Sequence, residues 1–392
     1  MERGEARNVN VILAAGGTGG HMVPAHALAA ELKKRGHGVG LVTDDRGARI
    51  PALFGDVPTH VLPAGRIGGG PIGWLKAVGS VIAGRREAKN LYRQFRPDAV
   101  VGFGGYPAFP ALLAASSLRI STILHEQNAV LGRVNRLLAG DAAAIATAYE
   151  QVDRLKPVYA TKAVLVGNPV REEVARLGEA PLPPFDEIAP LKILITGGSQ
   201  GASVLGKVVP EGLGALAPSL RHRLQIVQQC RPDDIESVRA RYAELGIPAD
   251  LSTYITDMPA KIADAHLVIA RAGASTIAEL TAAGRPAILV PLPSATDDHQ
   301  TVNAREMAKA GGARMIGQAE FTPDVLARQI EALAEDPQAL ANAAARSLSV
   351  GRPNAASDLA DLVERIAGGL SPIPVGLADR VRAQAPAAGV PA

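Results

Sequence analysis

Short apolar runs alternate with amphipathic stretches along the first half of the chain. Four of these runs have the length of strands and carry few charges, at residues 9–14, 39–43, 98–103 and 120–126. Between the first two lies the stretch 21–36, in which Ala27, Leu28 and Leu32 share one helical face. Because continuous apolar strands separated by helices are typical of parallel sheets buried on both faces, the pattern predicts a doubly wound α/β fold.

The second half of the chain repeats this organisation. Residues 191–203 read as strand, glycine turn and helix start, and Gly197 stands where Gly16 stands in the first half. Further strands are predicted at residues 222–229, 251–255, 265–273 and 285–293. Two similar halves that each open on a glycine turn predict two Rossmann-like domains facing a cleft.

Glycine and proline punctuation indicates the limits of these domains. We expect an N-terminal domain over residues 1–166 and a C-terminal domain over residues 167–350. A helix at about 354–368 is expected to complete the first domain. The Pro- and Ala-rich residues 370–392 are expected to be disordered.

Composition narrows the classes of function. The 392 residues include 41 basic and 38 acidic side chains, so the net charge of +3 allows only local basic patches. Aromatic residues make up 3%, which disfavours a stacking surface for single-stranded nucleic acid. Cys230 is the sole cysteine, which excludes an internal disulfide and a cysteine-based zinc site. The sequence contains no secretory signal and no run of about 18 apolar residues, so we expect a chain that is soluble or lies on a membrane surface.

The glycine-rich loop AAGGTGGH, residues 14–21, fails both common nucleotide fingerprints. A G-x-G-x-x-G frame started at Gly17 would put its third glycine on Met22, although Asp44 stands where a ribose-binding acid would be. No Gly-Lys-Ser/Thr follows, as a triphosphatase loop requires. His21 falls in the first turn of the next helix, where the backbone amides disfavour a positive imidazole and so suit a general base. Capping of that helix is the alternative.

Two motifs of the second half could hold a nucleotide. In RAGASTIAEL, residues 271–280, the amides of a helix that starts near Ser275 could hold a diphosphate. Glu279 would then accept the hydroxyls of a ribose, or it would be the capping-box partner of Thr276. Arg171, in GNPVR, could bridge phosphates or form an ordinary salt bridge.

The stretch TDDHQTVNA contains Asp297, Asp298 and His299, a composition that could suggest a metal site. Consecutive side chains point in different directions and no distant group of ligands matches them, so we expect no metal there. Hydrogen bonding to a sugar through Gln300 or Asn303 is the better use of this stretch.

The chain carries seven motifs in a fixed order: GGTGGH, GFGGYPAFP, HEQNAVLGRVNR, GNPVR, GGSQGA, RAGASTIAEL and PLPSATDDHQTVNA. Together they resemble the bacterial peptidoglycan glycosyltransferases that add N-acetylglucosamine to lipid I and so make lipid II. The resemblance covers residues from about 11 to 368. It implies an inverting, metal-independent enzyme of the GT-B fold that uses UDP-N-acetylglucosamine as donor and needs no cofactor.

The resemblance also implies roles for individual residues. In the family the donor sits mainly on the C-terminal domain and the acceptor on the N-terminal one. The residues that carry over to the donor are Thr18, Gly19, Gly20, Asn128, Arg171, Ser199, Ile255 (uracil, through its backbone), Ala274, Ser275, Thr276, Glu279 (ribose) and Gln300 (sugar hydroxyls). Tyr106 and Glu126 belong to the acceptor side. His21 is the first choice for the base that deprotonates the acceptor 4-hydroxyl, and Glu126 is the second.

A lipid-linked acceptor requires a membrane surface, and one segment offers it. Apolar and basic residues are interleaved there: Trp74, Leu75, Val78, Val81 and Ile82 beside Lys76, Arg85, Arg86, Lys89 and Arg93. This composition suits the anionic cytoplasmic face of a bacterial inner membrane, whereas a helix packed on its own sheet with a solvated basic face is the alternative.

The expected partners follow from this interpretation: UDP-N-acetylglucosamine, lipid I, an anionic membrane surface and other proteins of cell-wall synthesis, but no nucleic acid. Three other functions fit the same patterns less well. They are a related GT-B transferase with another acceptor, a UDP-sugar epimerase, and a regulatory module that binds a nucleotide sugar.

Overall fold

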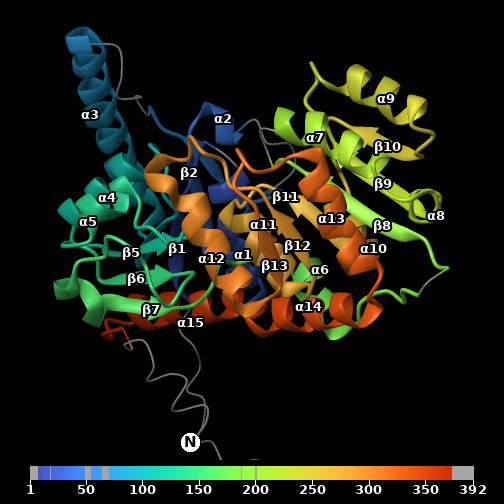
Figure 1. Ribbon diagram of the computed structural model, residues 1–392. Coiled ribbons are helices and arrows are strands. Elements are labelled where there is room, and N and C mark those ends of the chain that lie inside the picture. The colour runs from blue at the N-terminus through green and yellow to red at the C-terminus, as the bar shows by residue number, and fades with distance from the viewer. Residues whose placement is uncertain are drawn as a thin grey trace, which may run out of the picture. The chain divides into compact units, whose positions relative to one another are not determined.

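The computed structural model describes residues 8–17, 19–48, 54–63, 70–186, 188–198 and 201–372. The chain divides into two compact units (Figure 1). Unit 1 comprises Met1–Pro169 and Ala355–Ala392, and unit 2 comprises Val170–Asn354. Most of the tail predicted to be disordered, residues 370–392, lies outside the described residues.

Unit 1 contains a parallel sheet in the order β3-β2-β1-β4-β5-β6-β7. Its strands are β1 (Asn10–Ala14), β2 (Gly38–Thr43), β3 (Thr59–Val61), β4 (Ala99–Gly102), β5 (Ser121–Glu126), β6 (Ala144–Thr147) and β7 (Ala163–Leu165). Almost every residue of β1, β2, β4, β5 and β6 is buried, as expected for strands covered on both faces. The doubly wound sheet predicted from the apolar runs is confirmed.

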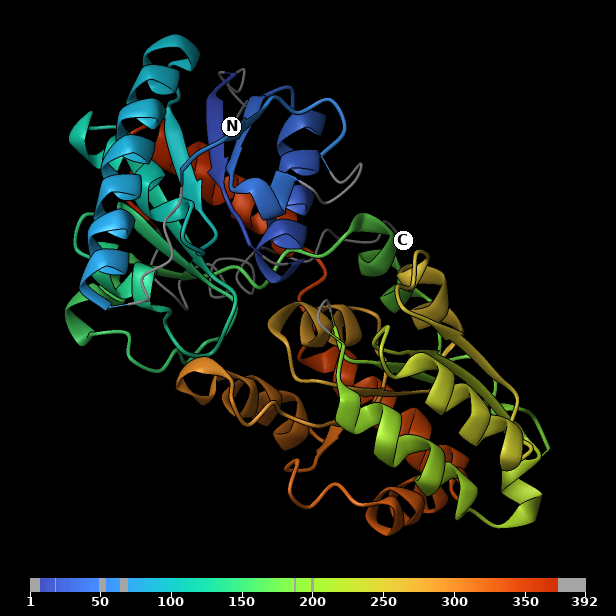
Figure 2. The same ribbon diagram turned by 90° about the horizontal axis from the view of Figure 1, so that it is seen from above.

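Helices cover both faces of this sheet (Figure 2). They are α1 (Gly19–Lys34), α2 (Asp45–Ala48), α3 (Gly70–Phe95), α4 (Ala108–Ser117), α5 (Arg133–Leu138), the 3₁₀ helix η1 (Pro157–Lys162) and α15 (Ala355–Ala367). Alternate residues of β1 face opposite layers: Leu13 packs with α1 and α15, whereas Ile12 packs with α3 and α4.

The helix α15 comes from the far end of the chain and packs on α1. Its apolar residues Leu359, Val363 and Ile366 join the same core cluster as α1. Polar contacts support this packing, because Arg35 Nη1 lies 2.6 Å from a carboxylate oxygen of Asp361 and 3.1 Å from one of Glu364. The last helix of the chain is therefore part of the first unit's core.

Unit 2 contains a parallel sheet in the order β10-β9-β8-β11-β12-β13. Its strands are β8 (Leu191–Thr196), β9 (Leu224–Gln229), β10 (Ala249–Ser252), β11 (Leu267–Ala270), β12 (Ala287–Leu289) and β13 (Ala313–Met315). The apolar runs of the second half thus form the second parallel sheet that they predict.

Helices also cover both faces of the second sheet. They are α6 (Glu172–Ala175), η2 (Arg176–Glu179), α7 (Ser203–Gly214), α8 (Pro218–Arg221), α9 (Ile235–Glu244), α10 (Met258–Asp264), α11 (Ala274–Ala282), η3 (Thr296–Asp298), α12 (His299–Ala310), α13 (Pro323–Ala334) and α14 (Pro337–Ser349). Ile193 of β8 joins the core cluster of α7, α9 and α13, and its neighbour Leu194 joins that of α10, α11 and α12. No helix among the described residues is long and apolar enough to cross a membrane.

Candidate active site

Each sheet has one topological switch point, and the glycine motifs lie there. In unit 1 the chain passes from β1 to β2 on one side and returns to β4 on the other, so the loops after β1 and β4 leave the same edge together. In unit 2 the same holds for the loops after β8 and β11. Ligands of open α/β sheets bind in the crevice at such points, so these four loops are the candidates for ligand binding.

Close packing explains the glycines of the first loop. A Cβ added to Gly16 would lie 2.4 Å from Cγ of Pro107, which follows the GFGG turn. Gly17 has a φ of +86°, a left-handed conformation that strains any residue with a side chain. The loops after β1 and β4 can approach each other because Gly16 lacks a side chain, whereas Gly17 supplies the left-handed turn.

Asp44 holds the first loop in place. Its carboxylate accepts hydrogen bonds from Gly17 N at 3.0 Å and from Gly47 N at 2.9 Å, and it pairs with Arg46. Burial alone would raise the pKa of Asp44, but the bonds from Gly47, Gly17 and Arg46 together hold it below its usual value. Asp44 therefore positions the first loop. Its place after β2 in the sequence had suggested a contact with a ribose instead.

His21 occupies the third position of α1 and lies against the second glycine turn. Its Nδ1 is 3.0 Å from the carbonyl oxygen of Gly16. A carbonyl oxygen can only accept, so Nδ1 carries the proton and Nε2 carries the lone pair. A Cβ added to Gly104 would lie 3.3 Å from His21 Nε2, and one added to Gly105 would lie 3.5 Å from Nδ1. The imidazole is therefore held in the tautomer that a general base requires.

The carboxylate of Glu126, at the end of β5, is enclosed by the loop that follows it. Glu126 is 2% exposed. One oxygen accepts from the backbone N and the side-chain Nδ2 of Asn128, at 3.1 and 3.2 Å. The other accepts from Gly132 N at 2.7 Å and from Asn135 Nδ2 at 2.8 Å. Four donors already use the oxygens that would have to take a proton, an arrangement that fits a residue shaping the loop better than a base.

His125 is a residue of this region that sequence reasoning missed. It is fully buried, its Nε2 donates to Gly167 O at 3.0 Å, and its Nδ1 accepts from Gln127 Nε2 at 2.9 Å. Burial is the main cause that lowers the pKa of His125 to about 4, against the hydrogen bond to Gly167, which raises it. A neutral His125 thus ties the end of β5 to the glycine of GNPVR. Its one signal in the sequence is a polar residue inside the apolar run ISTILHE.

In unit 2 the helix α11 begins at the switch point without a side-chain cap. Its N-cap is Gly273, which has an extended backbone and no side chain with which to cap the first turn. Ala274, Ser275 and Thr276 form that first turn. Because Glu279 is the sixth residue of the helix and the cap is three residues before Thr276, the capping-box alternative for Glu279 is wrong.

Glu279 pairs with Arg171 instead. Arg171 Nη2 lies 3.3 Å from Glu279 Oε1, with exposed side-chain fractions of 25% and 14%. Burial raises the pKa of Glu279, and Arg171 opposes that rise. The structure brings together two residues that are 108 positions apart and were assigned separately to phosphate and ribose.

Two other predicted donor residues, Ile255 and Gln300, follow strands β10 and β12 in the chain, and Gln300 stands in the first turn of α12. Ile255 is 8% exposed and its side chain belongs to the core, so its backbone is the part that can serve a ligand. Gln300 Oε1 accepts from Leu292 N at 3.0 Å and closes the loop between them. Arg271 supports the start of this loop by donating to the carbonyl oxygens of Val290 and Pro291, at 3.0 and 3.1 Å.

The remaining predicted residues have simpler places. Gly19 and Gly20 open α1, and Tyr106 is 41% exposed directly after the GFGG turn. Thr18 and Ser199 lie outside the described residues. Within the described residues, no group of three His, Cys, Asp or Glu side chains could hold a metal ion.

Comparison with known proteins connects these loops to a family. Residues 11–147 match the N-terminal domain of glycosyltransferase family 28, and residues 192–366 match its C-terminal domain. The chain belongs to glycosyltransferase family 28. A family member from Zymomonas mobilis subsp. mobilis, named UDP-N-acetylglucosamine–N-acetylmuramyl-(pentapeptide) pyrophosphoryl-undecaprenol N-acetylglucosamine transferase, is 61% identical over 92% of this chain and 93% of its own. A protein of the same name from Brucella abortus is 45% identical over 92% of this chain and 94% of its own.

Solved structures of similar fold agree with this family 28 membership. The crystal structure of MurG from Acinetobacter baumannii has a TM-score of 0.73 and 32% identity, and the match covers 91% of this chain and 99% of that one. A UDP-N-acetylglucosamine 2-epimerase from Neisseria meningitidis has a TM-score of 0.62 at 14% identity, covering 90% and 98%, which shows a shared fold alone. The GT-B fold and the family resemblance predicted from the motifs are confirmed.

Proposed function

We propose that this chain transfers N-acetylglucosamine from UDP-N-acetylglucosamine to the 4-hydroxyl of the muramyl sugar of lipid I, which yields lipid II for peptidoglycan synthesis. The observation that carries the proposal is the identity of 61% over 92% of the chain to a relative named for this transfer. The sugar-nucleotide epimerase shares the fold at only 14% identity, so the fold alone does not favour that activity.

His21 acts as the base in the proposed reaction. The acceptor hydroxyl must lose its proton as its oxygen attacks the anomeric carbon of the donor, while the bond to the UDP oxygen breaks with inversion. With Nδ1 donating to Gly16 O, the lone pair of Nε2 can take that proton. Glu126 acts through position: by holding Asn128 and Gly132 it fixes the loop that, with Tyr106, forms the acceptor side.

The donor is held by unit 2 in this proposal. The uncapped start of α11 offers its backbone amides to the diphosphate, because a helix N-terminus favours negative charge. Glu279 accepts the ribose hydroxyls, and Arg171 orients its carboxylate and opposes the rise in its pKa that burial causes. The backbone of Ile255 hydrogen-bonds to uracil, and the side chain of Gln300 hydrogen-bonds to the hydroxyls of the sugar. Thr18, Gly19, Gly20, Asn128 and Ser199 complete the contacts to sugar and diphosphate.

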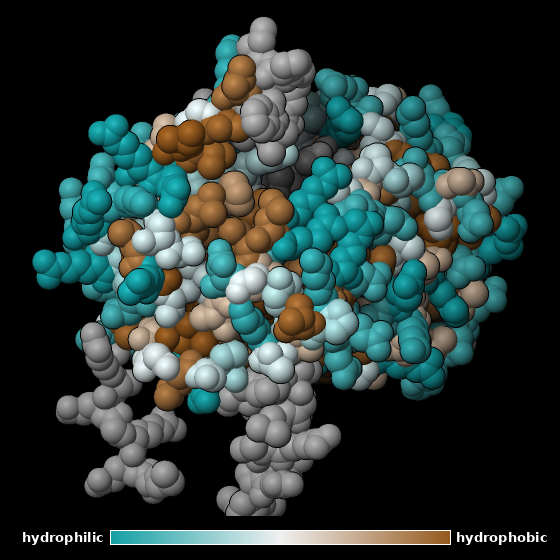
Figure 3. Space-filling model, turned by 90° about the vertical axis from the view of Figure 1, so that its left-hand side faces the viewer, coloured by the Kyte–Doolittle hydropathy of each residue, from teal (hydrophilic) through white to brown (hydrophobic). Residues whose placement is uncertain are grey.

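A membrane-facing helix supports a site of action at the cytoplasmic face of the bacterial inner membrane. Leu75, Val78 and Ile82 of α3 have exposed fractions of 63, 37 and 64%, although they are aliphatic. Lys76, Arg85 and Arg86 are exposed on the same helix. Figure 3 shows hydrophobic surface on the side of unit 1 that carries α3, with hydrophilic surface around it. Exposed apolar residues among basic ones suit an anionic bilayer surface.

The transfer is tested directly with radiolabelled UDP-N-acetylglucosamine and a lipid I analogue. We expect labelled disaccharide product, and the same rate in EDTA. Absence of product with every prenyl-diphosphate muramyl acceptor would sink the proposal. Release of UDP without acceptor would favour hydrolysis or epimerisation instead. Binding to anionic vesicles should fall when Leu75→Ser is combined with Ile82→Ser, and it should persist in a variant that combines the exposed control positions Met315→Ser and Leu370→Ser.

A further inference from the structure

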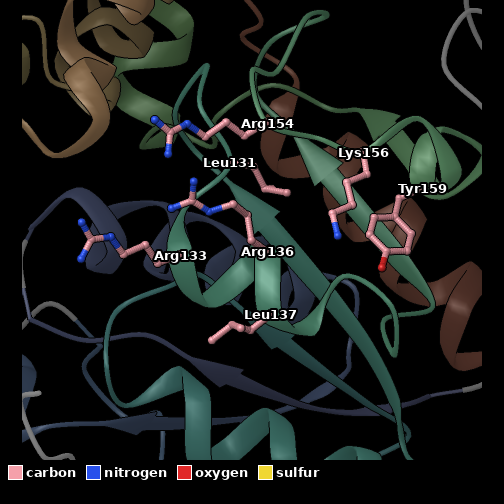
Figure 4. A pocket seen from close by; sticks show the side chains of 7 residues that line it. All are labelled: Leu131, Arg133, Arg136, Leu137, Arg154, Lys156 and Tyr159. Carbon is pink, nitrogen blue, oxygen red and sulfur yellow. The ribbon is translucent and has the colours of Figure 1, made fainter.

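A cavity of about 400 Å³ opens on unit 1 between α5 and the segment that follows β6 (Figure 4). None of the roles proposed above uses the side chains that line it, although Arg133 and Arg136 belong to the motif HEQNAVLGRVNR. A volume of this size is typical of small-ligand sites. The cavity is therefore a candidate site for a ligand other than the donor and the acceptor.

Positive charge dominates the lining. Arg133, Arg136, Arg154 and Lys156 all line the cavity, and none of its lining residues is an aspartate or a glutamate. Figure 4 shows the three guanidinium groups on one side, with Lys156 and Tyr159 on the other. Guanidinium forks match the oxygens of a phosphate, and an ammonium group adds a point charge. The chemistry of the lining thus selects a phosphate group that is approached from two sides.

The backbone around the cavity is fixed rather than loose. Leu131 N donates to Asp153 O at 2.8 Å, and Asp153 N donates to Ala129 O at 2.8 Å, which joins the two segments that carry the arginines. Arg154 has a φ of +67°, a left-handed conformation that costs an L-residue about 1–2 kcal/mol. Such a conformation persists where the surrounding structure imposes it. The backbone that carries the basic residues is therefore held in one conformation before any ligand binds.

One aliphatic side chain that lines the cavity and one on the neighbouring helix η1 are exposed. Leu137, which lines it, is 73% exposed, and Val158, which lies between Lys156 and Tyr159 in the chain, is 72% exposed. A free phosphate ion would gain nothing from these groups. A phospholipid would, because its acyl carbons follow directly behind the charged headgroup.

We propose that this cavity binds the headgroup of an anionic phospholipid, with the phosphate among the arginines and Lys156, and the first acyl carbons against Leu137 and Val158. The site goes beyond the transfer reaction and is separate from the diffuse attraction of α3 to a membrane. It would give unit 1 a second, stereochemically defined contact with the bilayer.

A soluble lipid separates this site from general attraction to a charged surface. The full-length protein is titrated by calorimetry with dihexanoyl phosphatidylglycerol below its critical micelle concentration, and with dihexanoyl phosphatidylcholine. We expect the anionic lipid to bind at least about tenfold more tightly, since each basic residue near a lipid charge contributes roughly a further fivefold. Arg136→Gln combined with Lys156→Gln should weaken binding by about ten- to thirtyfold.

The matched control is Arg85→Gln combined with Arg86→Gln on α3, which removes the same charge and should keep the wild-type affinity. Equal weakening in this control would overturn the proposal in favour of diffuse electrostatics. If the cavity variant does not fold, as checked by thermal melting, Arg133→Gln combined with Lys156→Gln tests the same site.

Further arms identify the ligand class. Leu137→Ser combined with Val158→Ser should weaken lipid binding about thirtyfold and leave phosphate binding unaffected, because about 1 kcal/mol is lost for each of the two apolar contacts. Inorganic phosphate that binds as tightly as the lipid, or geranyl diphosphate that displaces it at lower concentration, would overturn a phospholipid site. Transfer to a water-soluble acceptor analogue is measured in parallel and should stay at the wild-type rate in the cavity variant. Its failure in the wild type would count only against the proposed transfer.

Discussion

The Nδ1 of His21 donates a hydrogen bond to the carbonyl oxygen of Gly16, 3.0 Å away, across the turn that joins β1 to α1. Gly16 can approach the imidazole and Pro107 together because it has no side chain. The glycine-rich loop AAGGTGGH therefore holds His21 in one tautomer. It does not have the form of a standard nucleotide-binding loop. This relationship leads to a test that separates catalysis from support.

We expect His21→Asn to lose turnover almost as fully as His21→Ala. The asparagine amide can still donate to Gly16 O, but it has no counterpart of Nε2 to take the acceptor proton. General-base catalysis contributes about 10²–10⁴-fold, so both variants should lose kcat by that factor while UDP affinity changes little. Steady-state kinetics and a UDP titration measure the two effects. A His21→Asn variant with wild-type kcat would demote His21 to a structural residue.

Glu126→Gln should lower stability and acceptor affinity rather than abolish the chemistry. The amide would turn an NH₂ group toward donors such as Gly132 N and Asn135 Nδ2, which leaves buried groups unpaired at a cost of about 1–3 kcal/mol. We expect a lower melting temperature and a raised KM for the acceptor. The decisive readout is the pH profile of kcat/KM: its acidic limb should persist in Glu126→Gln, and its disappearance there would make Glu126 the base.

The pair Arg171–Glu279 predicts a dependence of stability on pH. The pKa of Glu279 is raised in the folded chain by burial, so the folded state holds that proton more tightly than the unfolded state does. Stability is then lost as pH rises from the usual value of 4.5 through the raised folded value. In Arg171→Ala the opposing cation is gone, so the loss should steepen and reach about 2 kcal/mol at neutral pH.

Calorimetry of Arg171→Ala at several pH values measures this slope, and Arg171→Ala combined with Glu279→Gln should remove the added part. If the slope of Arg171→Ala matches the wild type, the pair does not control the carboxylate. Glu279→Ala should also weaken UDP binding about tenfold, since a charged hydrogen bond contributes about 1.5–3 kcal/mol. Unchanged UDP affinity would limit Glu279 to a structural role.

Local sequence patterns were enough to predict the two sheets but not the contacts within the site. Buried parallel strands such as β1 and β8 can be recognised in the sequence as apolar runs, and the glycine turns indicate where these strands end. The partner of Glu279 lies 108 residues away, and no local pattern carries that distance. Asp44 stands at the position of a ribose-binding acid in the sequence, yet its carboxylate accepts hydrogen bonds from Gly17 N and Gly47 N. Spacing identifies which residues meet at a switch point, whereas hydrogen-bond geometry decides what each one does.

His125 predicts how unit 1 responds to acid. Its pKa is about 4 in the folded chain and about 6.5 when exposed, so the unfolded state takes up a proton first as pH falls. Stability is complete above pH 6.5 and should fall by about 3 kcal/mol as the pH drops to 4, at about 1.4 kcal/mol for each pH unit. Amide hydrogen exchange of strand β5 in urea, which depends on the opening of this sheet, reports on this unit. His125→Gln can still donate to Gly167 O but cannot take a proton, so it should flatten the slope, whereas the exposed control His222→Gln should leave it unchanged. An equally steep slope in His125→Gln would place the acid sensitivity elsewhere in the unit.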